Sequence, residues 1–147
     1  MHDLPGQLSV ETLAALFGGG TRFVARLAAY EDPLGRARDV LRTLPEDEVI
    51  EAINAHPRIG ARQLPSLSAA EQGADDDPAV LAELECLNAR YEAKFGFRFL
   101  VFVGRRPRGA IVEVLRARLG RTREEELQTA IDDLVAIAVD RYRRGVR

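Results

Sequence analysis

The chain has 147 residues, of which 46% are hydrophobic and 30% are charged, and its formal net charge is −2. This length fits one domain with a single sizeable core, and the near-neutral charge provides no whole-chain attraction to nucleic acid or to anionic membranes. The sequence has no apolar run of transmembrane length, no charged-then-apolar leader and no C-terminal peroxisomal signal. We therefore expect a soluble, cytoplasmic protein that binds neither nucleic acid nor membrane.

The single cysteine, Cys86, excludes an internal disulfide and a multi-cysteine metal site. It lies between Leu84 and Leu87 in a helical pattern, so we expect its thiol to be in the core. The sequence contains no Gly-rich phosphate loop, no metal-spaced set of His and Cys, and no Ser-His-Asp order. We therefore predict no metal site.

Short helices are predicted in the N-terminal third of the chain. Ser9 is the expected N-cap of the first helix, and the glycines at 18–20 end it. Thr21 is the expected cap of the second helix, which Pro33 is expected to end. A third helix follows, with an apolar face formed by Ala37, Val40, Leu41 and Leu44.

A fourth helix is predicted to begin at Pro45, because the acidic residues 46–48 suit a positive helix N-terminus. It should end near His56, because the residue before a proline is disfavoured in the α region. Residues 57–67 are then predicted to be a loop. The spacing of Ser68 and Glu71 is that of a capping box, which predicts a further helix start.

The clearest helix is predicted to begin at Asp77-Pro78 and to end at Gly96. Its apolar residues recur every three or four positions, at Leu81, Leu84, Leu87, Tyr91 and Phe95. Residues 97–103 have strand propensity but no partner strand, so we predict a buried extended segment.

Residues 105–109 are predicted to be a loop, followed by a helix that ends at Gly120. Thr122, with Glu125 three positions later, predicts the start of the last helix. Taken together, these patterns predict an all-α, compact, single domain over residues 1–147, with about seven or eight helices.

His56 is the first candidate for chemistry. Histidine titrates near neutral pH, and a helix C-terminus favours its protonated form, so His56 suits a proton donor. A surface or capping histidine is the alternative. Glu71 and Gln72 likewise have two interpretations, because a capping box is structural but also presents polar groups at a helix start.

Arg141 is unusual because it lies seven residues after Leu134, close to the apolar stripe of the last helix. We expect it either to reach the surface along that stripe or to meet a carboxylate at the edge of the core. The basic loop, Arg105 to Arg108, offers a different class of function. It would suit a helical binding module that contacts a nucleic acid or a protein.

Four ordered motifs identify a resemblance. They are Ala55-His56-Pro57-Arg58-Ile59-Gly60; Ser68-Ala69-Ala70-Glu71-Gln72; Leu87-Asn88-Ala89-Arg90-Tyr91 with Lys94-Phe95-Gly96-Phe97-Arg98-Phe99; and Arg118-Leu119 with Glu126 and Ile137 to Arg141. Over nearly its whole length the chain resembles the OHCU decarboxylase family, which acts on 2-oxo-4-hydroxy-4-carboxy-5-ureidoimidazoline. The resemblance implies an all-helical, cofactor-free homodimer that makes (S)-allantoin in urate breakdown.

The same resemblance implies the site residues. His56 matches the catalytic proton donor and Pro57 a substrate-contacting residue, while Glu71 and Arg141 match catalytic positions. Substrate binding is implied for Ser68, Glu71, Gln72 and the segment Phe99, Leu100, Val101, Phe102 and Val103, whose backbone would contact the ring. A functional association with hydroxyisourate hydrolase is a further expectation.

The chain departs from the family pattern at two positions. Arg98 stands where many members have proline, beside the predicted site, and Arg121 replaces a common asparagine at a helix junction. Arg98 leaves open a second substrate class, another ureido or carboxylated heterocycle on the same fold.

Overall fold

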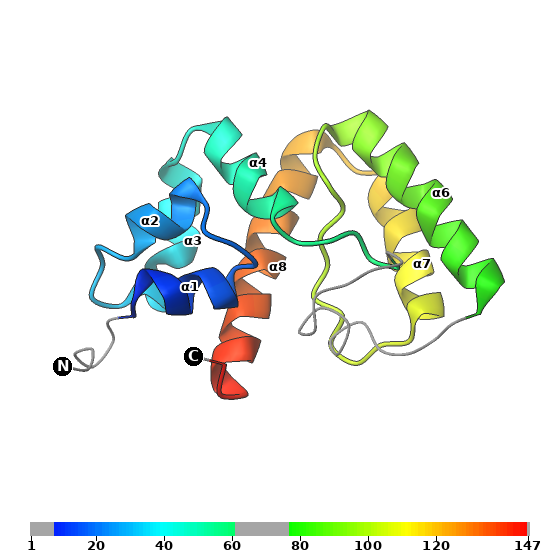
Figure 1. Cartoon of the computed structure of the whole chain (residues 1–147). Helices are drawn as coiled ribbons and strands as arrows, with labels where there is room; N and C mark the ends of the chain where they lie inside the picture. Colours follow the sequence, from blue (N-terminus) through cyan, green and yellow to red (C-terminus); the bar gives the residue numbers. More distant parts are fainter. Residues whose placement is uncertain (1–7, 61–76, 147) are drawn as a thin grey trace. The chain divides into compact units, whose positions relative to one another are not determined.

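The computed structural model describes residues 8–60 and 77–146, and within these ranges all regular structure is helical (Figure 1). The helices are α1 (Val10–Leu16), α2 (Arg22–Leu27), α3 (Pro33–Thr43), α4 (Glu46–Asn54), α6 (Pro78–Phe95), α7 (Arg108–Leu119) and α8 (Arg123–Arg143). The all-α prediction is therefore confirmed. The predicted helix start at Ser68 lies outside the described residues.

The chain divides into two compact units. The first comprises Met1–His56 and Ile131–Arg147, and the second comprises Pro57–Ala130. The boundary near the C-terminus falls inside α8. A single domain over residues 1–147 stays a prediction, and the two units are described in turn.

Local capping signals start the helices of the first unit. The Ser9 side chain accepts a hydrogen bond from Thr12 N, and the Thr21 side chain accepts one from Val24 N. Asp32 caps α3 through Gly35 N. The prediction that Pro33 ends the second helix was wrong, because α2 already ends at Leu27 and Pro33 is the first residue of α3, where its missing N–H costs nothing.

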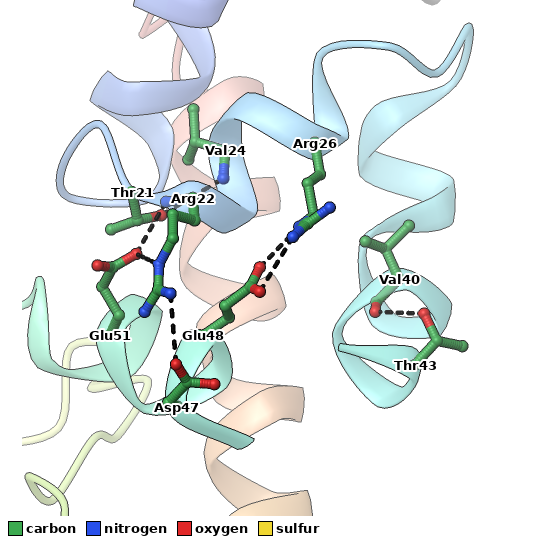
Figure 2. Close-up of polar contacts among 9 residues, drawn as sticks. All are labelled: Thr21, Arg22, Val24, Arg26, Val40, Thr43, Asp47, Glu48 and Glu51. Carbon is green, nitrogen blue, oxygen red and sulfur yellow. Dashed lines mark hydrogen bonds and ion pairs between the residues drawn. The ribbon is translucent and has the colours of Figure 1, made fainter. Parts of the chain in front are cut away.

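Helices α2 and α4 are joined by ion pairs (Figure 2). Arg26 Nε lies 2.6 Å from Glu48 Oε1, and its Nη2 lies 3.0 Å from Glu48 Oε2. Arg22 donates from its backbone N to Glu51 Oε1 over 2.8 Å and from Nη1 to Asp47 over 3.3 Å. These contacts fix the side of α4 that faces α2.

The core of the first unit is apolar and aromatic. Phe17 and Phe23 pack edge to face with their ring centroids 5.0 Å apart. The α4 residues Val49 and Ile53 are buried. The other buried apolar side chains include Leu13, Leu16, Val24, Leu27, Leu41, Ile131, Leu134 and Ala138.

The second unit is built on α6 and α7, which pack side by side (Figure 1). Asp77 caps α6, and Gly96 ends it with φ +82°, a conformation that favours glycine. Residues 97–103 are extended and form no strand, as predicted, and most of them are buried. The capping box at Thr122 and Glu125 is also confirmed, because each side chain accepts a hydrogen bond from the other's backbone N.

Cys86 corrects a second prediction. Its side chain is exposed, whereas Leu84 and Leu87 are buried. Cys86 lies two residues after Leu84, which is about 200° around a helix of 3.6 residues per turn. It therefore lies on the face opposite the core.

A buried polar cluster lies inside the second unit. Glu126 is fully buried and accepts hydrogen bonds from Tyr91 Oη (2.6 Å), Arg118 Nε (2.7 Å) and Arg121 Nη1 (2.8 Å). Arg118 also donates to Leu100 O over 2.9 Å. Burial and the Glu126 hydrogen bond raise the pKa of Tyr91 far above its usual value, so Tyr91 stays protonated as a donor. The cluster ties α6, α7 and α8 to the extended segment.

Candidate functional site

His56 lies just past the end of α4, as predicted. Helix α4 ends at Asn54 with Ala55 as its C-cap, and His56 N donates to Ile53 O over 3.3 Å. The side chain is only 4% exposed. A surface histidine is therefore excluded, and the imidazole is held in a protein environment that can control its orientation.

The imidazole lies against Gly18, which follows the C-cap of α1. The sequence predicted the glycines at 18–20 only as the end of a helix. The nearness of Gly18 to His56 was missed, because the two are far apart in sequence and only the fold brings them together. No local pattern signals this contact.

Arg141 is on the C-terminal part of α8 and is 2% exposed. Its Nη1 lies 3.0 Å from Ala15 O and 3.4 Å from Leu16 O, two carbonyls in the last turn of α1. The burial of Arg141 confirms that it lies at the apolar stripe and shows that the alternative in which it reaches the surface was wrong. The structure thus brings two predicted site residues, His56 and Arg141, to the same end of α1.

The residues after His56 begin the second unit, where they are anchored on α6. Pro57 is half-buried. Arg58 forms a two-pronged ion pair with Glu92, with distances of 2.6 and 2.9 Å, and Ile59 O accepts from Asn88 Nδ2 over 3.0 Å. Gly60 has φ +79° and packs against Leu84. The residues that follow His56 in its motif are therefore held in place by contacts with α6.

The carboxylate of Glu92 is stabilised by its neighbours. The hydrogen bonds from Arg58 lower the pKa of Glu92, and the charge of Arg98 lowers it further. Arg98 is half-buried. Arg98, the first departure from the family pattern, therefore lies near Glu92 of α6. The other, Arg121, donates to Glu126 and to Thr129 at the junction of α7 and α8.

The segment Phe99 to Val103 is predicted to bind substrate through its backbone. The side chains of Phe99, Leu100, Val101 and Val103 are buried. The Phe99 ring packs against Tyr91 at 5.3 Å and lies under the Arg118 guanidinium at 4.6 Å. These side chains serve the core, so any ligand contact from Phe99 would come from its backbone.

The arginines of the basic segment differ in their surroundings, because Arg105 and Arg106 are exposed and Arg108 is buried. Arg106 donates from Nε to Val103 O over 2.9 Å and from Nη2 to Phe102 O over 2.6 Å. Arg108 is 6% exposed. Arg108 is the first residue of α7, so the predicted loop over residues 105–109 was wrong at its end: it stops at Pro107, the N-cap of that helix. The predicted site residues Ser68, Glu71 and Gln72 lie outside the described residues.

A model of the OHCU decarboxylase family matches residues 8–143. The chain is 33% identical over 98 residues to a 2-oxo-4-hydroxy-4-carboxy-5-ureidoimidazoline decarboxylase of Halalkalicoccus jeotgali, covering 63% of this chain and 56% of that protein. It is 25% identical over 150 residues to the uric acid degradation bifunctional protein PucL of Bacillus subtilis, covering 94% of this chain and 30% of that protein. The match thus spans about half or less of the length of these relatives.

Solved structures share the fold. An OHCU decarboxylase crystallised in the presence of (S)-allantoin superposes with a TM-score of 0.78 at 23% identity, covering 93% of this chain and 97% of that chain. An (S)-allantoin synthase superposes with a TM-score of 0.68 at 19% identity, covering 92% of this chain and 48% of that chain. The fold is a helical one that these proteins share. The chain belongs to the OHCU decarboxylase family.

Proposed function

We propose that this protein decarboxylates 2-oxo-4-hydroxy-4-carboxy-5-ureidoimidazoline (OHCU) to (S)-allantoin in urate catabolism, without a cofactor. The observation that carries the proposal is the family match over residues 8–143. The burial of His56 and Arg141, which lie at one end of α1, supports it.

The substrate supplies its own electron sink. When the bond to the carboxylate breaks, CO2 leaves and the electron pair moves into the conjugated C=N system of the ring. The enol-like anion then takes one proton at the ureido-bearing carbon, and the enol oxygen becomes a carbonyl as its proton passes through solvent to the ring nitrogen that received the electron pair. An acid fixed on one face of that carbon yields one enantiomer, and we assign this role to His56.

The other site residues are assigned to binding. Arg141 would anchor the substrate carboxylate or balance the charge of the site, because a guanidinium pairs well with a carboxylate. Glu71 and Gln72, with Ser68, would hydrogen-bond the ureido and ring N–H groups. Pro57 and the backbone from Phe99 to Val103 would contact the ring. Water exclusion by this apolar region would favour release of uncharged CO2.

The test is CO2 release from freshly generated OHCU. We expect the folded protein to release CO2 faster than the spontaneous reaction does, and heat-denatured protein to leave the rate unchanged. Equal rates with and without folded protein would reject the proposal.

Arg98 supports a second candidate, a related ureido or carboxylated heterocycle on the same fold. Its half-buried position close to Glu92 distinguishes this chain from members with proline there. A ligand that binds the native state raises apparent thermal stability. A series of Tm measurements with allantoin and related ureides therefore distinguishes the two candidate substrate classes. A larger rise in Tm with another heterocycle than with allantoin favours the second candidate.

We further propose that the protein is a cytoplasmic homodimer that works beside hydroxyisourate hydrolase. The resemblance to a protein named as bifunctional in uric acid degradation supports a link to neighbouring pathway steps. None of the helices in the described ranges is long and apolar enough to cross a membrane. Light scattering after size exclusion tests the dimer, and a mass near the monomer value of 16.3 kDa would reject it.

A further inference from the structure

The His56 ring is covered by the backbone at Gly18. A methyl group placed on the Gly18 Cα would lie 3.2 Å from both Cε1 and Nε2 of His56 and 3.3 Å from Nδ1. These distances are tighter than ordinary van der Waals contact. The backbone of Gly18 therefore packs directly on the imidazole, with no space for a side chain between them.

The equal distances show which part of the ring is covered. A point in the ring plane beside Cε1 would be much closer to that carbon than to the two nitrogens. A point nearly equidistant from all three atoms lies above the face of the ring. Gly18 thus fixes the tilt of the ring plane, and it does not cap the in-plane directions in which the nitrogens donate or accept protons.

The conformation at Gly18 explains why glycine is needed there. Its φ is +84°, in the left-handed region that L side chains rarely adopt. Gly19 and Gly20 differ, because a methyl on Gly19 would make only ordinary contact with Ala55 at 3.7 Å, and one on Gly20 would meet no atom within 4 Å. Of the three glycines, only Gly18 is required by the contact with His56.

Arg141 holds the turn that carries Gly18. The last carbonyls of a helix have no partner within the helix, and Arg141 donates to two of them, at Ala15 and Leu16. A buried cation is also favoured at this negative end of the α1 dipole. Arg141 therefore stabilises the end of α1 two residues before Gly18.

We propose that Gly18 is a positioning residue for the His56 imidazole, and that Arg141 holds it in place through the last turn of α1. The part of this proposal that concerns catalysis rests on the proposed function, in which His56 is the proton donor. A wrongly tilted ring would direct its N–H away from the reacting carbon. The proposal gives Arg141 a role that needs no direct contact with substrate.

The test compares glycine variants by NMR and by activity. In a His2→Ala background, the only imidazole signals come from His56. We expect Gly18→Ala to shift the His56 ring resonances and their titration midpoint, with an unchanged helical circular-dichroism spectrum. We expect kcat to fall by about tenfold to a hundredfold, while KM changes by no more than about twofold.

Two matched variants separate contact from backbone strain. Gly96→Ala carries the same kind of positive φ, +82°, with no atom within 4 Å, and Gly20→Ala carries neither cost. Both should leave the His56 resonances and kcat unchanged. Gly18→Asn serves if Gly18→Ala unfolds, because asparagine tolerates positive φ better and still carries a Cβ.

The outcomes are decisive in either direction. Wild-type His56 resonances in a folded Gly18→Ala or Gly18→Asn protein would overturn the proposal, as would the unfolding of both variants while Gly96→Ala folds. If the wild-type protein releases no CO2, the proposed function fails, but the resonances still decide whether Gly18 positions the ring.

Arg141→Gln tests the second link. It should shift the His56 resonances in a folded protein, whereas Arg144→Gln, which removes an exposed ion pair to Asp140, should not. Loss of activity alone would not distinguish positioning from substrate binding. An unchanged His56 spectrum in Arg141→Gln would overturn the role assigned to Arg141.

Discussion

We predict that loss of the buried Glu126 carboxylate strongly destabilises the protein. Glu126→Ala removes a fully buried carboxylate that accepts hydrogen bonds from Tyr91, Arg118 and Arg121. Arg118 is itself 6% exposed, so its cation would be left in a site with little access to water. Breaking a buried ion pair in this way costs about 3–5 kcal/mol.

That cost is large compared with the stability of a typical domain, which is about 5–15 kcal/mol. For a chain of this size, each kcal/mol lowers Tm by about 2–4 °C. We therefore expect Glu126→Ala to lower Tm by about 6–20 °C. Thermal unfolding followed by circular dichroism measures the shift.

Glu124→Ala is the matched control, because Glu124 is an exposed glutamate in the same first turn of α8. Losing its interaction with the helix dipole should cost only about 0.3–1 kcal/mol. A double-mutant cycle with Arg118→Ala should give a coupling energy of about 0.5–3 kcal/mol. If Glu126→Ala and Glu124→Ala melt at the same temperature, the buried cluster does not stabilise the fold as argued.

Three further changes give separate expectations. His56→Ala should remove most of the decarboxylase activity, by about a hundredfold or more, and leave the helical spectrum unchanged. Gly60→Ala should destabilise the protein by about 1–3 kcal/mol in denaturant unfolding, because φ is +79° and the new methyl would lie 3.1 Å from Leu84 Cδ1. Arg26 lowers the pKa of Glu48, so their ion pair stabilises the folded state above the ordinary glutamate pKa of 4.5, and this stabilisation is lost as the pH falls below that value. Arg26→Gln removes the ion pair, so the Tm of this variant should fall less on acidification than the Tm of the wild type.

Each expectation has its own control. Near-full activity in His56→Ala would reject His56 as the donor. Gly96→Ala shares the positive φ of Gly60 without its contact, so it should be the less damaging of the two substitutions. Arg38→Gln removes an exposed ion pair to Asp132, and the acid sensitivity of Tm should stay as in the wild type. If Tm falls equally on acidification in Arg26→Gln and in the wild type, the ion pair of Arg26 with Glu48 does not provide the acid-sensitive stability.

Much of the fold follows from local sequence signals. Ser9, Thr21 and Thr122 start helices because their side-chain oxygens accept hydrogen bonds from the first-turn N–H groups, and Gly96 ends one because it adopts a positive φ. Such signals depend on residues within one turn of each other, so they can be recognised in a single sequence.

Contacts between distant residues could not be predicted in this way. Glu126 appears as one more acidic residue of a charged first turn, yet it is fully buried because three donors from other parts of the second unit surround it. Gly18 appears as a helix stop, and only the fold brings it onto His56. The same limit applies to Arg141: its position on the stripe was predictable, but its carbonyl partners on α1 were not.

The configuration of the allantoin product tests the central claim most directly. Freshly generated OHCU is mixed with wild-type protein, and the circular-dichroism signal of allantoin is followed beside the uncatalysed reaction. We predict that the (S)-allantoin signal grows faster than spontaneous decay allows. A folded protein that yields no such acceleration, or that yields both enantiomers equally, would contradict a single proton donor acting on one face.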